Sequence, residues 1–145
     1  VVPGGSGATL PLAIYFTRSK SERLRRVGWL GIPPGIFNIN EPITFGAPII
    51  FNPILAIPFI IITFLNTTVA YLATSAGLVR PTYIAAPWTL PSPLLMFLAT
   101  GYDWRAIIVA ILTEFVIPGI IWYPAFKAWE KEVLQREEAA VTATA

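Results

Sequence analysis

One carboxylate and two amides lie close together in an apolar part of the chain. Glu41 is the only charged residue between Arg26 and Arg80; Asn40 directly precedes it, and Asn38 lies three residues before it. An ionisable group in an apolar membrane segment costs several kcal/mol unless it pairs, binds a ligand or lines water. Amides and a carboxylate can together hydrogen-bond a polyhydroxy ligand. We therefore expect a ligand site at Glu41; the alternative is that its carboxylate only satisfies loose amides at a hairpin tip.

Two residue types that carry much enzyme chemistry are missing. The chain has no cysteine and no histidine. It therefore offers no thiolate nucleophile, no disulfide, and neither of the commonest metal ligands. We expect no metal site and no cofactor.

The composition is that of a membrane protein with interrupted helices. Of the 145 residues, 55% are hydrophobic and 12% are charged, whereas about 25% is usual for charged residues in soluble domains. The 14 prolines and 10 glycines stand among Ile, Leu and Phe, as in the broken helices of transporters. The expected fold class is all-α: a polytopic membrane protein with transmembrane helices and re-entrant hairpins.

The first elements combine a short apolar run with a basic loop. Residues 8–16 are about half as long as a membrane-spanning helix, so we interpret them as the end of a truncated span. The chain opens with Val-Val-Pro, without an initiator Met or a signal-peptide pattern, and we expect an internal start. Residues 18–26 form a basic loop that the positive-inside rule assigns to the cytoplasm; a compatible alternative is a solvated basic helix that binds anionic lipid headgroups. Its basic residues are Arg18, Lys20, Arg23, Arg25 and Arg26.

Prolines divide the long uncharged part of the chain. They recur every five or six residues from 42 to 58, so residues 33–52 are expected to form a re-entrant hairpin rather than one helix. A spanning helix is expected from about 53 to 76, with Gly77 as its C-cap. Residues 80–103 contain four prolines and Trp88, and we expect a second irregular element without a helix that crosses the membrane.

The last span is expected at residues 106–126, interrupted by Glu114 and Pro118. Counting crossings from a cytoplasmic basic loop places the C-terminus inside, together with Lys127, Lys131 and Arg136, as the charge bias requires. We expect residues 1–130 to form the substrate-binding part of one transmembrane domain. Residues 131–145 are expected to be a cytoplasmic tail that is helical and then frayed.

Three further features have structural interpretations. The glycines of GGSG at 4–7 lack the Lys-Ser/Thr of a phosphate-binding loop and are expected to form a sharp turn. Glu114 is expected to be satisfied by Thr113, by backbone groups that Pro118 frees, or by a neighbouring helix; the alternative is a proton or ligand site. Asp103 and Arg105 are expected to form a structural cap at the interface.

Several segments resemble the phosphotransferase-system enzyme IIC permeases of the lactose, cellobiose and diacetylchitobiose type. The most specific is GIPPGIFNINEPITFGAPIIFNPILAIPF, residues 31–59. The resemblance also covers GGSGATL, SKSERLR, PWTLPSPL, ATGYDWRA and YPAFKAWEK, and so extends over nearly the whole chain.

The resemblance implies a function. In that family the IIC subunit binds a disaccharide in the membrane and presents its 6-hydroxyl to a phosphocysteine of the cytoplasmic IIB partner, which works with IIA. Glu41 is then the catalytic carboxylate that holds the hydroxyl, with Asn40 beside it. Trp88 is the aromatic platform for a sugar ring and Thr89 lines the pocket; the alternative for Trp88 is an interfacial anchor. Lipid contacts, a homodimer at full length and a bacterial cell-membrane location are implied, and no nucleic acid.

The sequence also departs from the family. The family has a histidine in the sugar site upstream of this region, and this chain has none; the N-terminal spans of the dimer are missing as well. The resemblance therefore implies an incomplete sugar site in this chain. The alternatives are a proton-coupled secondary transporter, with Glu41 or Glu114 as the coupling group, and a non-functional truncated remnant.

Overall fold

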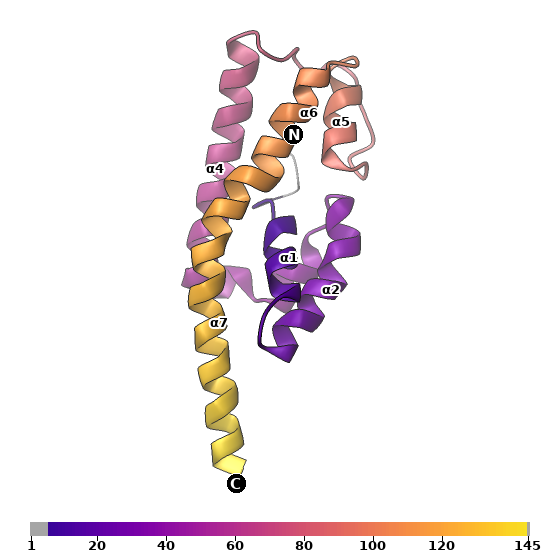
Figure 1. Cartoon of the computed structure of the whole chain (residues 1–145). Coiled ribbons are helices and arrows are strands. Elements are labelled where there is room, and N and C mark those ends of the chain that lie inside the picture. Colours follow the sequence, from indigo (N-terminus) through magenta and orange to yellow (C-terminus); the bar gives the residue numbers. More distant parts are fainter. Residues whose placement is uncertain (1–5, 145) are drawn as a thin grey trace.

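The computed structural model describes residues 6–144, which are helical and connected without any β-strand (Figure 1). The expected all-α class is confirmed. The elements, in chain order, are α1 (Leu10–Thr17), α2 (Glu22–Ile36), α3 (Glu41–Gly46), the 3₁₀ turn η1 (Ile49–Phe51), α4 (Pro53–Ser75), α5 (Ser92–Ala99), α6 (Trp104–Ile111), the π-helical turn η2 (Leu112–Val116) and α7 (Ile117–Thr144).

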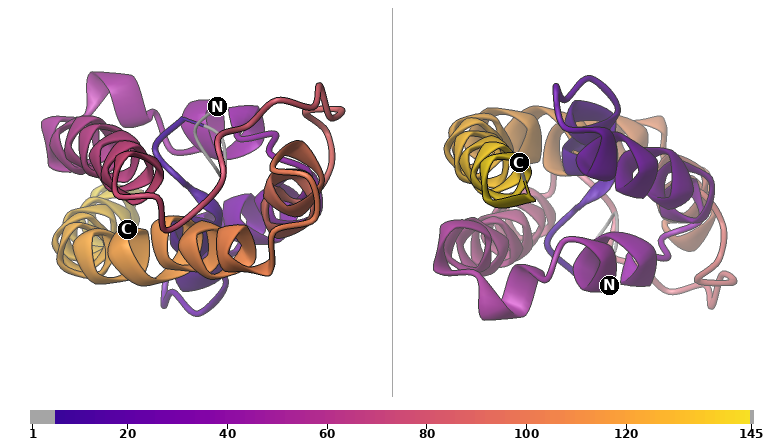
Figure 2. Two further views of the ribbon diagram at one scale, coloured as in Figure 1. Left: turned by 90° about the horizontal axis from the view of Figure 1, so that it is seen from above. Right: turned by 90° about the horizontal axis from the view of Figure 1, so that it is seen from below.

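Two long helices form one side of the molecule. α4 packs beside the continuous run of α6, η2 and α7, and both views of Figure 2 place the two columns together, with α1 and α2 across from them. Both α4 and the α6–α7 run contain a stretch that is long and apolar enough to cross a membrane. Only 17% of this stretch is buried within the protein in α4, and 33% in the α6–α7 run. Helices this apolar and this exposed are typical of lipid-facing or subunit-facing spans rather than of a soluble core.

The ends of α4 follow from its sequence. Asn52 is the N-cap, and its side-chain oxygen accepts the Ile54 N–H at 3.0 Å. At the other end Gly77 has a left-handed φ of +70°, and the Leu78 N–H returns to the Ala73 carbonyl at 3.0 Å, the bond of a Schellman cap. The predicted helix and its glycine cap are thus confirmed to within a residue.

α1 and α2 form a tight helical hairpin. A Cβ added at Gly28 would lie 2.7 Å from the backbone nitrogen of Thr17, and one at Gly31 would lie 2.0 Å from Ile43. Gly28, Gly31 and Gly35 are spaced along one face of α2, so this face admits α1 and α3 at a distance that side chains would prevent.

One expectation for this region is wrong. α1 begins at Leu10 and is buried, so residues 8–16 are one arm of a hairpin rather than the end of a longer span. The basic residues from Arg23 onward lie in the first turns of α2, which begins at Glu22 with Ser21 as its N-cap, as the alternative of a basic helix expects. Residues 33–52 are not one helix, as predicted; they consist of the end of α2, which includes Pro33 and Pro34, then a turn, α3 and η1.

The segment between α4 and α6 contains the short helix α5, which has 8 residues and is not among the helices long enough to cross a membrane. α5 packs against α6 (Figure 1). Pro91 precedes α5 and Pro93 lies in its first turn, where the backbone N–H has no helical partner in any case. These prolines therefore start the helix instead of breaking it.

The last span is longer than expected. The helical run continues from Trp104 to Thr144, so the tail is not frayed within the described residues.

The interruption at Glu114 and Pro118 is a π-helical turn, in which an N–H bonds the carbonyl five residues before it. Pro118 has no N–H to give to Thr113, and the Asn66 side chain of α4 donates to that carbonyl instead, at 2.6 Å. The boundary at 130/131 stays a prediction, although α7 passes through it unbroken.

A polar clip joins the α1–α2 turn to α7 beyond the apolar windows. One Glu130 carboxylate oxygen accepts the Ser19 hydroxyl at 2.7 Å and the Lys20 backbone N–H at 2.8 Å, and Lys127 approaches the other at 3.4 Å. Burial raises the pKa of Glu130, but these donors outweigh burial and leave the pKa below its ordinary value. The clip fixes the hairpin relative to the long helix.

Replacing Glu130 by Ala should lower the free energy of unfolding by about 1 to 3 kcal/mol, because the buried Ser19 hydroxyl loses its acceptor. A carboxylate with a lowered native pKa stabilises the fold above its unfolded pKa, and this contribution disappears as the pH falls through the native value. The difference from the parent chain should therefore shrink between pH 7 and pH 3. Thermal unfolding in detergent measures it.

The matched control is Glu132→Ala, which removes an exposed ion pair with Arg136 on the same helix and should cost less than about 0.5 kcal/mol. Equal losses in the two variants, or a Glu130 effect that grows in acid, would contradict the clip.

Candidate functional site

Glu41 directly follows the turn that joins α2 to α3. α2 ends at Ile36, and Asn38 adopts a left-handed φ of +62°, which Asn tolerates better than most residues. The Ile39 N–H bonds back to the Pro34 carbonyl at 3.0 Å and closes the turn. The chain then enters α3 with Asn40 as its N-cap residue.

Glu41 is the first residue of α3, and its side chain is exposed. Within residues 6–144 no hydrogen bond or ion pair engages its carboxylate. Both oxygens are therefore free to accept hydrogen bonds from a ligand. The alternative hypothesis is that the Glu41 carboxylate only bonds loose amides at the tip of its own hairpin. No such hydrogen bond is present within residues 6–144.

Asn40 is half-buried and links the turn to the segment before α1. Its Nδ2 donates to the Ser6 carbonyl at 2.6 Å. Next to Ser6, Gly7 has φ +75°, and its carbonyl accepts the Trp122 indole N–H at 3.1 Å. The expected sharp turn is thus observed at Gly7; Gly4 and Gly5 lie outside the described residues.

Trp88 and Thr89 lie exposed on the loop before α5. The Asn38 Nδ2 donates to the Trp88 carbonyl at 2.9 Å and to the Leu90 carbonyl at 2.6 Å, so the turn that presents Glu41 is bound to the loop that presents Trp88. The structure therefore brings the two predicted segments together. The Trp88 ring, 66% exposed, also lines a cavity of about 310 Å³ with residues 82–86, and neither Asn40 nor Glu41 lines it.

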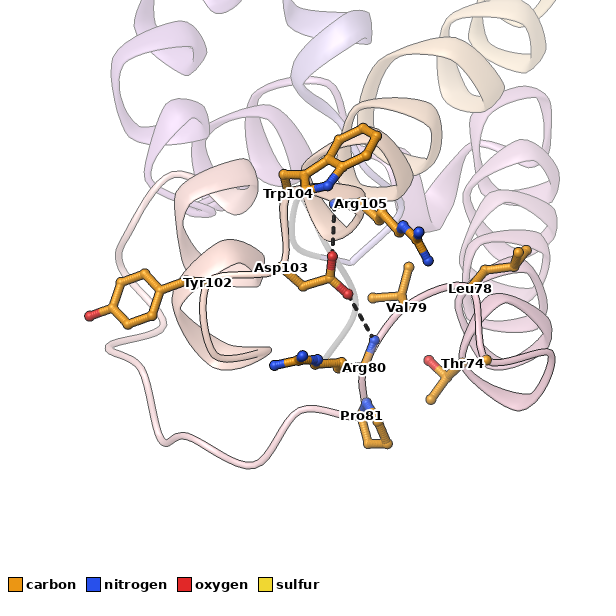
Figure 3. Close-up of a pocket in the computed structure, with 10 residues that line it drawn as sticks. Thr74, Leu78, Val79, Arg80, Pro81, Tyr102, Asp103, Trp104 and Arg105 are labelled. Carbon is orange, nitrogen blue, oxygen red and sulfur yellow. Dashed lines mark hydrogen bonds between the residues drawn. The ribbon is translucent and has the colours of Figure 1, made fainter.

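A larger cavity of about 590 Å³ lies elsewhere, between the end of α4 and the start of α6 (Figure 3). There the Asp103 carboxylate accepts the backbone N–H groups of Arg80 at 3.1 Å and Arg105 at 3.0 Å, and these bonds hold its pKa below the usual range. Figure 3 shows the two arginine side chains directed away from each other. Asp103 is a cap, as expected, but it acts on backbone groups, and none of the predicted site residues lines this cavity.

Sequence reasoning missed two participants. Asn38 was noticed only as a polar neighbour of Glu41, and Ser92 was not noticed at all. Ser92 is buried, and its hydroxyl donates to the Asn38 Oδ1. The only signal in the sequence was a serine between two prolines ahead of an apolar run. Among the described residues no group of three His, Cys, Asp or Glu side chains is placed to hold a metal.

Comparisons with known proteins give a consistent family assignment. The family model described as "Phosphotransferase system, EIIC" matches residues 1–63. The chain is 46% identical to the putative permease IIC component YwbA of Bacillus subtilis over 140 residues, which is 95% of this chain and 31% of that protein. It is also 46% identical to a cellobiose-specific EIIC component of Geobacillus stearothermophilus, covering 96% of this chain and 31% of that protein.

A solved structure has the same fold. The transporter ChbC, the IIC component of an N,N'-diacetylchitobiose-specific phosphotransferase system, superposes with a TM-score of 0.88 at 38% identity, covering 95% of this chain and 32% of that one. The chain spans about a third of the length of these relatives. Since sequence and fold agree over nearly all of its length, the chain belongs to the enzyme IIC family of phosphotransferase-system sugar permeases.

Proposed function

We propose that this chain is the sugar-binding part of a permease that takes up a disaccharide such as cellobiose, lactose or diacetylchitobiose and couples uptake to phosphorylation. The observation that carries the proposal is the free carboxylate of Glu41 on a turn that Asn38 fastens to the Trp88 loop. The names of the relatives support the class of sugar, since two of those compared are cellobiose- and diacetylchitobiose-specific components.

The proposed chemistry assigns each residue a role. Glu41 accepts a hydrogen bond from the 6-hydroxyl of the sugar and takes its proton as that oxygen attacks the phosphoryl group. The S–P bond of the IIB phosphocysteine breaks, the O–P bond forms, and the thiolate leaves. Asn40 offers its Oδ1, which accepts no hydrogen bond within residues 6–144, to another sugar hydroxyl. Trp88 covers the apolar face of a ring, and Thr89 lines the pocket.

The proposed orientation in the bacterial cell membrane follows the charges. The basic turn at 18–26 and the charged end of α7 lie on one side, joined by the Glu130 clip, and this side is cytoplasmic by the positive-inside rule. IIB, recharged by IIA, then approaches from there. Bilayer lipid and a second copy of the permease are the proposed neighbours of the exposed apolar faces.

A proton-coupled transporter is the second candidate, and one observation favours it. Glu114 is 2% exposed, and its Oε2 has no hydrogen-bond partner in the described structure. The two functions differ in energy source. Phosphoryl transfer requires phosphoenolpyruvate and yields a 6-phosphosugar inside, whereas proton coupling is abolished by an uncoupler.

The first test places residues 1–145 in a complete permease, exchanged for the matching segment of the cellobiose-specific EIIC component of Geobacillus stearothermophilus. We expect cellobiose uptake that depends on phosphoenolpyruvate and gives cellobiose phosphate. Glu41→Gln should abolish phosphorylation, because an amide cannot take the hydroxyl proton, while the protein still inserts in the membrane. Near-normal phosphorylation by this variant would remove Glu41 from the reaction.

The second test concerns the ring of Trp88. Trp88→Ala should weaken cellobiose binding by about 1 to 3 kcal/mol, which is about 5- to 150-fold. The control is Trp29→Ala, which removes an equally exposed indole, 67% against 66%, on α2. Equilibrium binding to the purified exchanged permease measures both. Equal affinity in the two variants would return Trp88 to the role of an interfacial anchor.

A further inference from the structure

The proposed sugar site depends on two segments that meet through one side chain. The turn that presents Glu41 and the loop that presents Trp88 lie 50 residues apart in the sequence at Asn38 and Trp88. Resting on the proposed function, we propose that Asn38 is the positioning residue that sets the Trp88 loop against Glu41, and that Ser92 orients its amide.

The Asn38 amide is fully engaged. Its Nδ2 has two N–H donors, and these serve the Trp88 and Leu90 carbonyls at 2.9 Å and 2.6 Å. Its Oδ1 accepts the Ser92 hydroxyl. The reverse orientation would set Oδ1 against two carbonyl oxygens, which cannot donate. The amide therefore has one satisfied orientation, and this orientation fixes the loop relative to the turn.

The backbone supports the same role. Asn38 has φ +62°, a conformation that most side chains avoid, so its side chain leaves the turn in a direction that a helical residue would not adopt. Asn38 is half-buried and Ser92 is 1% exposed, so water competes little for their bond. Hydrogen bonds shielded from water in this way hold geometry better than exposed ones.

The experiment uses the exchanged permease described above, with cellobiose as the probe. Asn38→Gly keeps the left-handed backbone and removes the amide, and Asn38→Asp faces the two carbonyls with an acceptor. Each should lower cellobiose affinity by about five- to tenfold. The control for Asn38→Gly is Tyr102→Gly. Tyr102 also has a left-handed φ, of +66°, but it lies beyond the C-terminal end of α5, so this change should leave the cellobiose affinity unchanged.

Two further readouts distinguish positioning from general loss of structure. In a protein that already carries Trp88→Ala, Asn38→Gly should lower the cellobiose affinity by less than about a further twofold, since the effects of residues that act as one unit are not additive. Acrylamide quenching of Trp88, isolated by subtracting the spectrum of a Trp88→Phe protein, should increase in Asn38→Gly without sugar present. Full additivity with Trp88, or unchanged quenching, would overturn the positioning role.

Because the quenching measurement needs no sugar, it decides the role of Asn38 even if the permease binds no cellobiose, an outcome that would refute the proposed function alone.

Discussion

The constraint on which the rest of this structure depends is that backbone polar groups in an apolar surrounding must find partners within the protein. The chain has 14 prolines, each without a donor, and so it breaks its helices often. Where the helices are interrupted, side chains form hydrogen bonds with the backbone carbonyls that have no helical partner. Asn66 bonds the carbonyl that Pro118 leaves open, Trp122 bonds the Gly7 carbonyl, and Asn38 bonds two carbonyls of the next loop. The interruptions therefore create the polar contacts that hold distant segments together.

Close packing of the first hairpin gives these contacts a fixed frame. The glycines of α2 let α1 and α3 approach it closely, and the Glu130 clip fastens the opposite end of the hairpin to α7. The turn at Asn38 thus follows a tight helix pair whose other end is fixed to the long helix. A carboxylate on such a turn is positioned by rigid elements, which a binding group needs to recognise one arrangement of hydroxyls.

How much the sequence predicts depends on how local the cause is. The bounds of α4 follow from Asn52, Pro53 and Gly77, which act within a few residues, and Glu41 is marked by its charge alone. α5 was missed because proline both breaks and starts helices, and its position in a helix is known only once the helix is placed. The role of Asn38 could not be read at all, since its partners lie 50 and 52 residues away and are backbone carbonyls that any residue type would offer.

The carboxyl groups divide according to their surroundings, and this division singles out Glu41. Asp103 precedes the long helical run and Glu130 lies within α7, and at both places N–H and O–H donors stabilise the charge of the carboxylate and lower its pKa. Glu114 is buried in the π-helical turn η2, on the side of Ser92 of α5. Glu41 has neither kind of partner within residues 6–144, although it stands in the longest weakly charged stretch of the chain. A charge that the fold leaves unsatisfied there is one that a hydroxylated ligand can satisfy, so binding such a ligand gains the hydrogen bonds that folding did not make.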